Sequence, residues 1–130
     1  MDCRHVMVID DDDDIRNCLK DVLEYEGYDV YSARNGKDAL DQLTSLSEKE
    51  LPGCIFLDLM MPIMDGVTFL EKVEEKDKIQ LAKIPVLVTS ANLQAYDQQS
   101  LHHAVERLAK PLDIDTIFNA VHHYCGHPIH

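Results

Sequence analysis

The sequence predicts an α/β fold in which a doubly wound parallel sheet of five strands is flanked by five helices. Short apolar runs alternate along the chain with segments whose apolar residues recur at helical spacing. Parallel neighbours need helical crossovers, which are right-handed, so this alternation favours a parallel sheet with helices on both faces. The 130 residues, 45% hydrophobic and 28% charged, are typical of one water-soluble globular domain.

The first half of the chain contains two predicted strands and two predicted helices. Residues 6–9 form a continuous apolar run that ends abruptly in acid, which suits a strand buried on both faces. Apolar residues at helical spacing then lead to Gly27, a typical helix stop. Residues 28–32 read as a second strand, and the second helix carries Ala39, Leu40, Leu43 and Leu46.

The second half repeats this order of elements. Pro52-Gly53 breaks the chain before a third strand at residues 54–57, and Pro85 precedes a fourth strand at residues 86–88. We expect a third helix between them, carrying Val67, Leu70 and Val73. A fourth helix is expected over residues 92–104, although its polar centre weakens the apolar stripe, and a fifth strand at residues 107–109. The last helix carries Ile114, Ile117, Phe118 and Val121 and ends before Gly126 and Pro128.

The charge of the chain argues against several classes of partner. With 24 acidic and 12 basic residues, the formal net charge is −12, which repels nucleic acids and anionic membrane surfaces. No apolar run approaches the roughly 18 residues of a membrane span, and the N-terminus has no apolar signal segment. We therefore expect a cytoplasmic protein that binds neither nucleic acid nor membrane directly.

The four cysteines, at positions 3, 18, 54 and 125, are widely scattered and lack the two-residue spacing of zinc ribbons and redox motifs. Cys18 falls on the apolar stripe of a predicted helix and Cys54 opens a predicted strand, so packing explains both. Reduced thiols are therefore predicted.

Polar side chains follow the predicted central strands where each strand ends. Asp10 and Asp11 end the first strand, Asp58 the third, Thr89 the fourth and Lys110 the fifth. In a doubly wound sheet, ligands bind outside these carboxyl ends, where the strand order reverses. Clustered carboxylates repel each other unless a cation neutralises them, and Mg²⁺ prefers such oxygen ligands. The sequence therefore predicts a Mg²⁺ pocket at this edge.

The same set of residues suits phosphoryl transfer. A carboxylate is a competent nucleophile toward phosphorus if the charge on the equatorial oxygens is neutralised. A metal ion, the Lys110 ammonium group and the Thr89 hydroxyl can share that task.

Over residues 4 to about 124, the chain resembles the receiver domain of a two-component response regulator. The resemblance rests on motifs that occur in family order and at family spacing: Val8-Ile9-Asp10-Asp11-Asp12, Asp58-Leu59-Met60-Met61-Pro62 with Met64-Asp65-Gly66, Thr89-Ser90-Ala91 and Lys110-Pro111. It implies a flavodoxin-like sheet of order 2-1-3-4-5 and one stand-alone, chemotaxis-regulator-like domain over 1–130, with residues 125–130 as a tail.

The resemblance also implies a role for each matching residue. Asp58 would be the phosphoacceptor, Asp10, Asp11 and Asp58 would bind Mg²⁺ together with the Met60 carbonyl, and Thr89 and Lys110 would contact the phosphoryl group. A cis peptide bond is implied at Lys110-Pro111. Such a domain is not an enzyme toward other substrates, since it catalyses only its own phosphorylation and dephosphorylation.

Arg107 departs from the family pattern, because receiver domains usually place a rotamer-switching aromatic residue there. We expect the Arg107 side chain to stay outward and to pair with a partner's acid or with a nearby carboxylate such as Glu106, or else to be solvated without a role.

The implied partners are a sensor histidine kinase or a histidine phosphotransfer protein, which donates the phosphoryl group. An output protein would bind through the fourth helix, the fifth strand and the fifth helix, and the domain is expected to be a monomer or a weak dimer.

Several other interpretations compete with these. The acidic run from Asp10 to Asp14 could be solvated surface, but that explains neither its place after a strand nor the remote Asp58. The same run could also be a calcium-binding loop, but Ile15 stands where such a loop requires glycine. His122, His123, Cys125, His127 and His130 could bind zinc or nickel, although Gly126 and Pro128 break the helix that would align them, which favours a frayed terminus.

Two other functions remain open. An aspartate-nucleophile phosphatase would use Asp10 as its nucleophile, but neither a late acidic motif nor a substrate-covering insertion is visible. An interaction module that is never phosphorylated would not need the full set of acids, hydroxyl and lysine.

Overall fold

The computed structural model describes residues 3–61, 63–75, 79–96, 101 and 104–128. Its five strands form one parallel sheet of order β2-β1-β3-β4-β5, which confirms the predicted fold. The strands are β1 (His5–Ile9), β2 (Asp29–Ala33), β3 (Cys54–Asp58), β4 (Val86–Ser90) and β5 (Ala104–Ala109). The strand order reverses between β1 and β3, which is where such sheets bind ligands.

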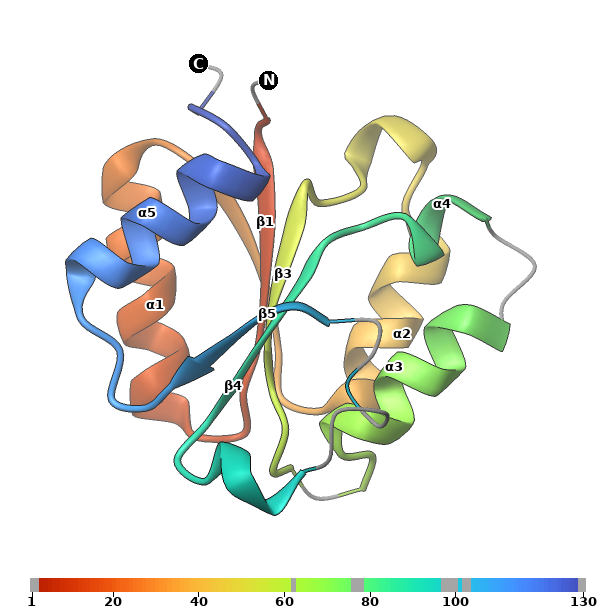
Figure 1. The fold of residues 1–130 in the computed structure, drawn as a ribbon. Coiled ribbons are helices and arrows are strands. Elements are labelled where there is room, and N and C mark those ends of the chain that lie inside the picture. Colours follow the sequence, from red (N-terminus) through yellow and green to blue (C-terminus); the bar gives the residue numbers. More distant parts are fainter. Residues whose placement is uncertain (1–2, 62, 76–78, 97–100, 102–103, 129–130) are drawn as a thin grey trace.

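Helices cover both faces of this sheet (Figure 1). One face is covered by α1 (Asp13–Glu26) and α5 (Ile114–Tyr124), and the other by α2 (Gly36–Ser45) and α3 (Gly66–Glu75). A short α4 (Ile79–Ala82) and two 3₁₀ helices, Glu48–Glu50 and Leu93–Ala95, complete the described elements. None of the helices in the described part of the chain is long and apolar enough to cross a membrane.

Two apolar clusters pack against the two faces because successive strand residues point to opposite sides. In β1, Met7 and Ile9 contact the cluster under α2 and α3, whereas Val6 and Val8 contact the cluster under α1 and α5. The central strands are buried throughout, which explains why they read as unbroken apolar runs.

Capping residues set the start of α1, the end of α1 and the start of α5. The Asp12 carboxylate accepts hydrogen bonds from the Asp14 and Ile15 amides at the start of α1, and Asp113 caps α5 through the Thr116 amide. Gly27 ends α1 with φ 119°, a left-handed conformation that glycine adopts without steric cost. The stop predicted at Gly27 is confirmed.

The segment after β4 differs from the prediction of a helix over 92–104. Its described part contains only the 3₁₀ helix Leu93–Ala95, and Ala104 already belongs to β5; residues 97–100 and 102–103 lie outside the described residues. The prediction is therefore wrong for residues 92–96 and for Ala104, where the apolar stripe is weak. The described α4 precedes β4 instead, where no helix was predicted.

The prediction of four reduced cysteines is wrong for Cys3 and Cys125, which form a disulfide with a Cα–Cα distance of 5.4 Å. The start of β1 and the end of α5 meet at one edge of the sheet. There the backbones of Cys3 and Pro128 also form an isolated parallel β-bridge. Sequence spacing gives no sign of this contact, because the two cysteines are 122 residues apart.

Candidate functional site

The carboxyl ends of four strands meet at one edge of the sheet. Asp10 directly follows β1, and Asp58 is the last residue of β3, in register with Thr89 of β4. Lys110 follows β5, and its amide donates a hydrogen bond of 2.9 Å to the Ser90 carbonyl. The structure therefore brings together side chains that lie up to a hundred residues apart in the sequence.

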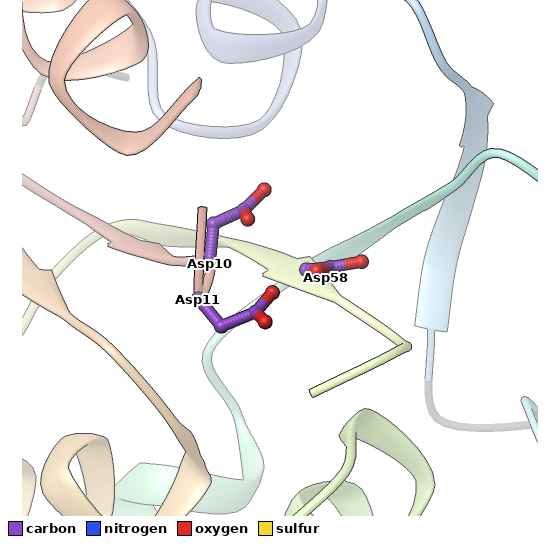
Figure 2. Close-up of side chains that lie close together, drawn as sticks. All are labelled: Asp10, Asp11 and Asp58. Carbon is purple, nitrogen blue, oxygen red and sulfur yellow. The ribbon is translucent and has the colours of Figure 1, made fainter. Parts of the chain in front are cut away.

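Asp10, Asp11 and Asp58 form an acidic cluster at this edge (Figure 2). One carboxylate oxygen from each lies within 4.8 Å of the other two. Asp10 and Asp58 are 2% and 5% exposed, whereas Asp11 is open to solvent. Among the described residues, no other group of three or more potential ligands gathers so closely. An all-oxygen set with one open side suits a hard divalent cation that keeps some of its waters.

Lys110 bridges the two buried carboxylates. Its Nζ lies 2.9 Å from Asp10 Oδ2 and 3.4 Å from Asp58 Oδ1. Burial alone would lower the pKa of Lys110, but the hydrogen bond to Asp10 and the charges of Asp10 and Asp58 outweigh it, so the pKa is raised. Lys110 is therefore held as a cation beside both acids.

The surroundings of the Asp58 carboxyl group disfavour its ionised form. Burial, followed by the charge of Asp10, raises its pKa to about 6, against the opposing effects of Lys110 and of the Met60 amide. That amide donates a hydrogen bond of 3.3 Å to Asp58 Oδ1. A cation in the cluster would relieve this repulsion and favour the ionised carboxylate.

Asp10 is held by contacts on both carboxylate oxygens and on its backbone. The Asp12 amide donates to Asp10 Oδ1 at 2.9 Å, and Lys110 donates to Oδ2. Arg16 Nη1 donates to the Asp10 carbonyl oxygen at 2.8 Å, and Arg16 also pairs with Asp13. The role of Arg16 was missed by the sequence analysis; the only sequence signal is an acid three residues before it on the same helix.

The loop after β3 forms the rim of the site. Met60 is 60% exposed, and Ile63, 80% exposed, has φ 68°, which is rare for a β-branched residue. Beside this loop, a hollow of about 400 Å³ is lined by Asp11, Leu59, Met60, Met61, Asp65 and Tyr96. Burial, then Asp65 and Asp58, raise the pKa of the Tyr96 phenol. Tyr96 was not predicted to lie near the site.

Thr89 is buried in β4 beside Asp58, and its hydroxyl donates a long hydrogen bond of 3.5 Å to the Leu57 carbonyl. Arg107 lies on β5 with an exposed side chain, as predicted. The Lys110-Pro111 peptide bond is cis, which confirms that prediction.

The histidines near the C-terminus do not gather into a ligand set with three donors among the described residues. His122 pairs with Glu26 at 2.7 Å, its ring lies 4.8 Å from that of His127, and His123 packs against Tyr124. His130 lies outside the described residues. The prediction of a frayed terminus is wrong for residues 125–128, where Cys125 is buried and the Cys3 amide donates to the His127 carbonyl.

A family model for the response regulator receiver domain matches residues 6–122. The chain belongs to this family. The receiver domain is 33% identical over 119 residues to sporulation initiation phosphotransferase F of Bacillus subtilis, an alignment that spans 92% of this chain and 91% of that protein. It is also 38% identical over 86 residues to the sensor histidine kinase TmoS of Ectopseudomonas mendocina. That alignment covers 66% of this chain and 8% of that protein.

Solved structures agree with this assignment. The response regulator TrrA from Thermotoga maritima, in complex with Mg²⁺-BeF, superposes with a TM-score of 0.79 at 26% identity, covering 93% of this chain and 98% of that one. The chemotaxis protein CheY4 of Vibrio cholerae gives a TM-score of 0.82 at 24% identity, covering 94% and 98%, a likeness of fold alone.

Proposed function

We propose that this receiver domain accepts a phosphoryl group on Asp58 in a Mg²⁺-dependent reaction. The observation that carries the proposal is the buried Asp58 carboxylate at the carboxyl edge of β3, beside two further acids and 3.4 Å from the Lys110 ammonium group. Both the Met60 amide and the Lys110 ammonium group contact Asp58 Oδ1. A nucleophile, a cation site and a fixed positive charge thus occupy one pocket.

The transfer takes place between Asp58 and a phosphohistidine of the donor protein. An Asp58 carboxylate oxygen forms a bond to phosphorus as the nitrogen–phosphorus bond to the donor imidazole breaks, and the electron pair returns to that nitrogen, which takes up a proton. Lys110 neutralises charge on one phosphoryl oxygen, and Thr89 donates a hydrogen bond to another after its hydroxyl turns from Leu57. When bound, Mg²⁺ would supply the remaining positive charge.

Asp10, Asp11 and Asp58, together with the Met60 carbonyl, are the residues that would hold this ion. Asp10 is fixed from three sides and is therefore suited to a ligand position. The exposed Asp11 leaves room for water on the ion.

The contacts of Asp10 argue against the alternative of a phosphatase that uses Asp10 as its nucleophile. Both Asp10 oxygens already accept hydrogen bonds, from the Asp12 amide and from Lys110. An attack by either oxygen would therefore compete with a hydrogen bond that this oxygen already accepts. No observation favours a module that is never phosphorylated.

A histidine kinase or a histidine phosphotransfer protein is the proposed donor, because one relative is named as a phosphotransferase and another as a sensor histidine kinase. For the output protein we propose the surface of β5, α5 and the segment over 92–104. Its described part has a hollow of about 460 Å³ lined by Glu106, Leu108, Thr116, Asn119, Ala120, His123 and Tyr124. A cytoplasmic location, a monomer or weak dimer, and the pairing of Arg107 stay predictions.

Incubation with a small acyl phosphate and Mg²⁺ tests the proposed function without a partner. We expect the intact mass to rise by one phosphoryl group, and we expect EDTA to prevent this. A mass that stays unchanged under conditions in which a known receiver domain is labelled would contradict phosphoryl acceptance.

Magnesium binding predicts a change in stability that can be measured separately. At roughly ten to a hundred times its dissociation constant, Mg²⁺ should add about 1–3 kcal/mol to the free energy of unfolding, because it binds the folded carboxylates only. Asp11→Ala should shrink this gain, whereas Asp21→Ala, which removes an exposed acid of α1, should retain it. Equal melting temperatures with Mg²⁺ and with EDTA in the wild type would refute the metal site.

A further inference from the structure

A disulfide joins the two ends of the described chain. Cys3 lies just before β1 and Cys125 just after α5, and their Cα atoms are 5.4 Å apart, as is usual for a disulfide. The start of β1 and the end of α5 lie at the same, amino edge of the sheet (Figure 1). The acidic pocket lies at the opposite, carboxyl edge. The bridge therefore closes nearly the whole domain into a loop.

The surrounding backbone is shaped around this bridge. A Cβ atom on Gly53 would lie 2.7 Å from Cys125 Sγ and 2.8 Å from Cys3 Cβ, so only glycine leaves space for the two sulfurs. The Gly53 amide donates to the His5 carbonyl at 2.8 Å, which fixes this glycine against β1. On the other side, the Tyr28 hydroxyl donates to the Gly126 carbonyl and holds the turn after Cys125.

The reduced form can also be accommodated. The His5 carbonyl oxygen lies 3.8 Å from Cys3 Sγ and 3.9 Å from Cys125 Sγ, and each free thiol could donate its weak hydrogen bond there. Neither oxidation state would leave a buried donor without an acceptor.

We propose that Cys3 and Cys125 form a reversible oxidation site, a thiol–disulfide clamp that ties the end of α5 to the start of β1 under oxidising conditions. A reducing cytoplasm would keep the pair as thiols, and a low-molecular-weight disulfide such as oxidised glutathione would close it. The clamp does not depend on phosphoryl acceptance at Asp58.

The difference in exposure sets the order of the two exchange steps. Cys3 is half-buried and Cys125 is 1% exposed, so the Cys3 thiolate attacks oxidised glutathione first and releases one glutathione thiolate. The Cys125 thiolate then attacks the Cys3 sulfur and releases the second glutathione. The two protein thiols lose two electrons and two protons, which appear in two molecules of reduced glutathione.

The other two cysteines do not take part. Cys54 follows Gly53 but is fully buried, and burial raises its pKa to about 12, so it remains a thiol that does not exchange. Cys18 is exposed on α1 and is a free thiol. Because an exposed thiol would itself form a glutathione adduct, Cys18 is replaced by serine in the test below.

The test uses the full chain with Cys18→Ser as background, equilibrated in glutathione buffers of increasing oxidised fraction. Peptide mass mapping without reductant should show one cross-link, Cys3 to Cys125, that reductant reverses. Because the bridge constrains the unfolded chain, the oxidised form should melt higher by on the order of 10 °C. Adding Cys3→Ser should abolish both the cross-link and this shift.

The order of reaction gives a second readout. With Cys125→Ser, oxidised glutathione should leave an adduct on Cys3, whereas with Cys3→Ser the native protein should carry almost none on Cys125. Labelling of Asp58 by a small phosphodonor should proceed equally in both oxidation states, which separates this clamp from the proposed function. No cross-link even in fully oxidised glutathione, or equal melting temperatures of cross-linked and reduced forms, would overturn the proposal.

Discussion

Replacing Asp58 with asparagine is expected to stabilise the metal-free protein at neutral pH. Burial and the neighbouring Asp10 raise the pKa of Asp58 to about 6 in the folded protein, above the value of about 3.9 expected for the unfolded chain. Ionised Asp58 therefore costs folding free energy of about 2–3 kcal/mol. Asparagine nearly preserves the shape of the side chain and removes its charge.

The pH dependence of this effect follows from the direction of the pKa shift. Between about pH 4 and pH 6 the folded protein binds more protons at Asp58 than the unfolded chain does, so stability falls as the pH rises. In EDTA, the free energy of unfolding of Asp58→Asn should therefore exceed that of the wild type only slightly near pH 4. This difference should grow through pH 6 and level off near pH 7. Denaturant unfolding of both proteins across this range measures it. A variant that is less stable than wild type at neutral pH, or a difference that does not change with pH, would contradict the repulsion described at the site.

Gly66→Ala is expected to destabilise the domain by about 3 kcal/mol, with a fall in melting temperature of about 10 °C. A Cβ atom there would lie 2.7 Å from Leu59 Cα and 2.9 Å from the Asp58 carbonyl oxygen. These are backbone atoms directly behind the site, so α3 or the end of β3 must move. The rate of Asp58 labelling should fall as well.

Gly36→Ala is the matched control for this substitution. Its added Cβ, at the first residue of α2, would lie 3.0 Å from Cγ and Sδ of Met64 and 3.1 Å from the Met64 carbonyl oxygen, which are looser contacts than the 2.7 Å at Gly66. We expect a change within about 1 kcal/mol. Equal effects of the two substitutions on the melting temperature would show that close approach to the β3 backbone is not what Gly66 provides.

Most of the fold and of the site could be predicted because each strand carries its own local signal. The apolar runs that end in Asp10, Asp58 and Thr89 are buried on both faces, and parallel strands bring their carboxyl ends to one edge whatever lies between them. The gathering of these side chains at one edge therefore follows from the parallel arrangement of the strands, without knowledge of any side-chain contact.

The features that were missed depend on contacts between distant segments or on weak local patterns. The disulfide between Cys3 and Cys125 arises because the first strand and the last helix meet, which no local pattern reports. The place of Tyr96 beside the rim depends on how the chain turns after β4, where the apolar pattern is too weak to fix a helix. The positive φ of Ile63 also escaped prediction, because a β-branched residue gives no signal for that conformation.

The position of the acyl phosphate is the most direct test of the proposed function. Borohydride reduces an acyl phosphate to an alcohol and so converts the phosphorylated aspartate into homoserine, which peptide mass spectrometry can locate. After incubation of the wild type with a small acyl phosphate and Mg²⁺, we predict homoserine at position 58 and none at Asp10 or Asp11. Homoserine at position 10 would instead support the phosphatase mechanism and contradict Asp58 as the phosphoacceptor.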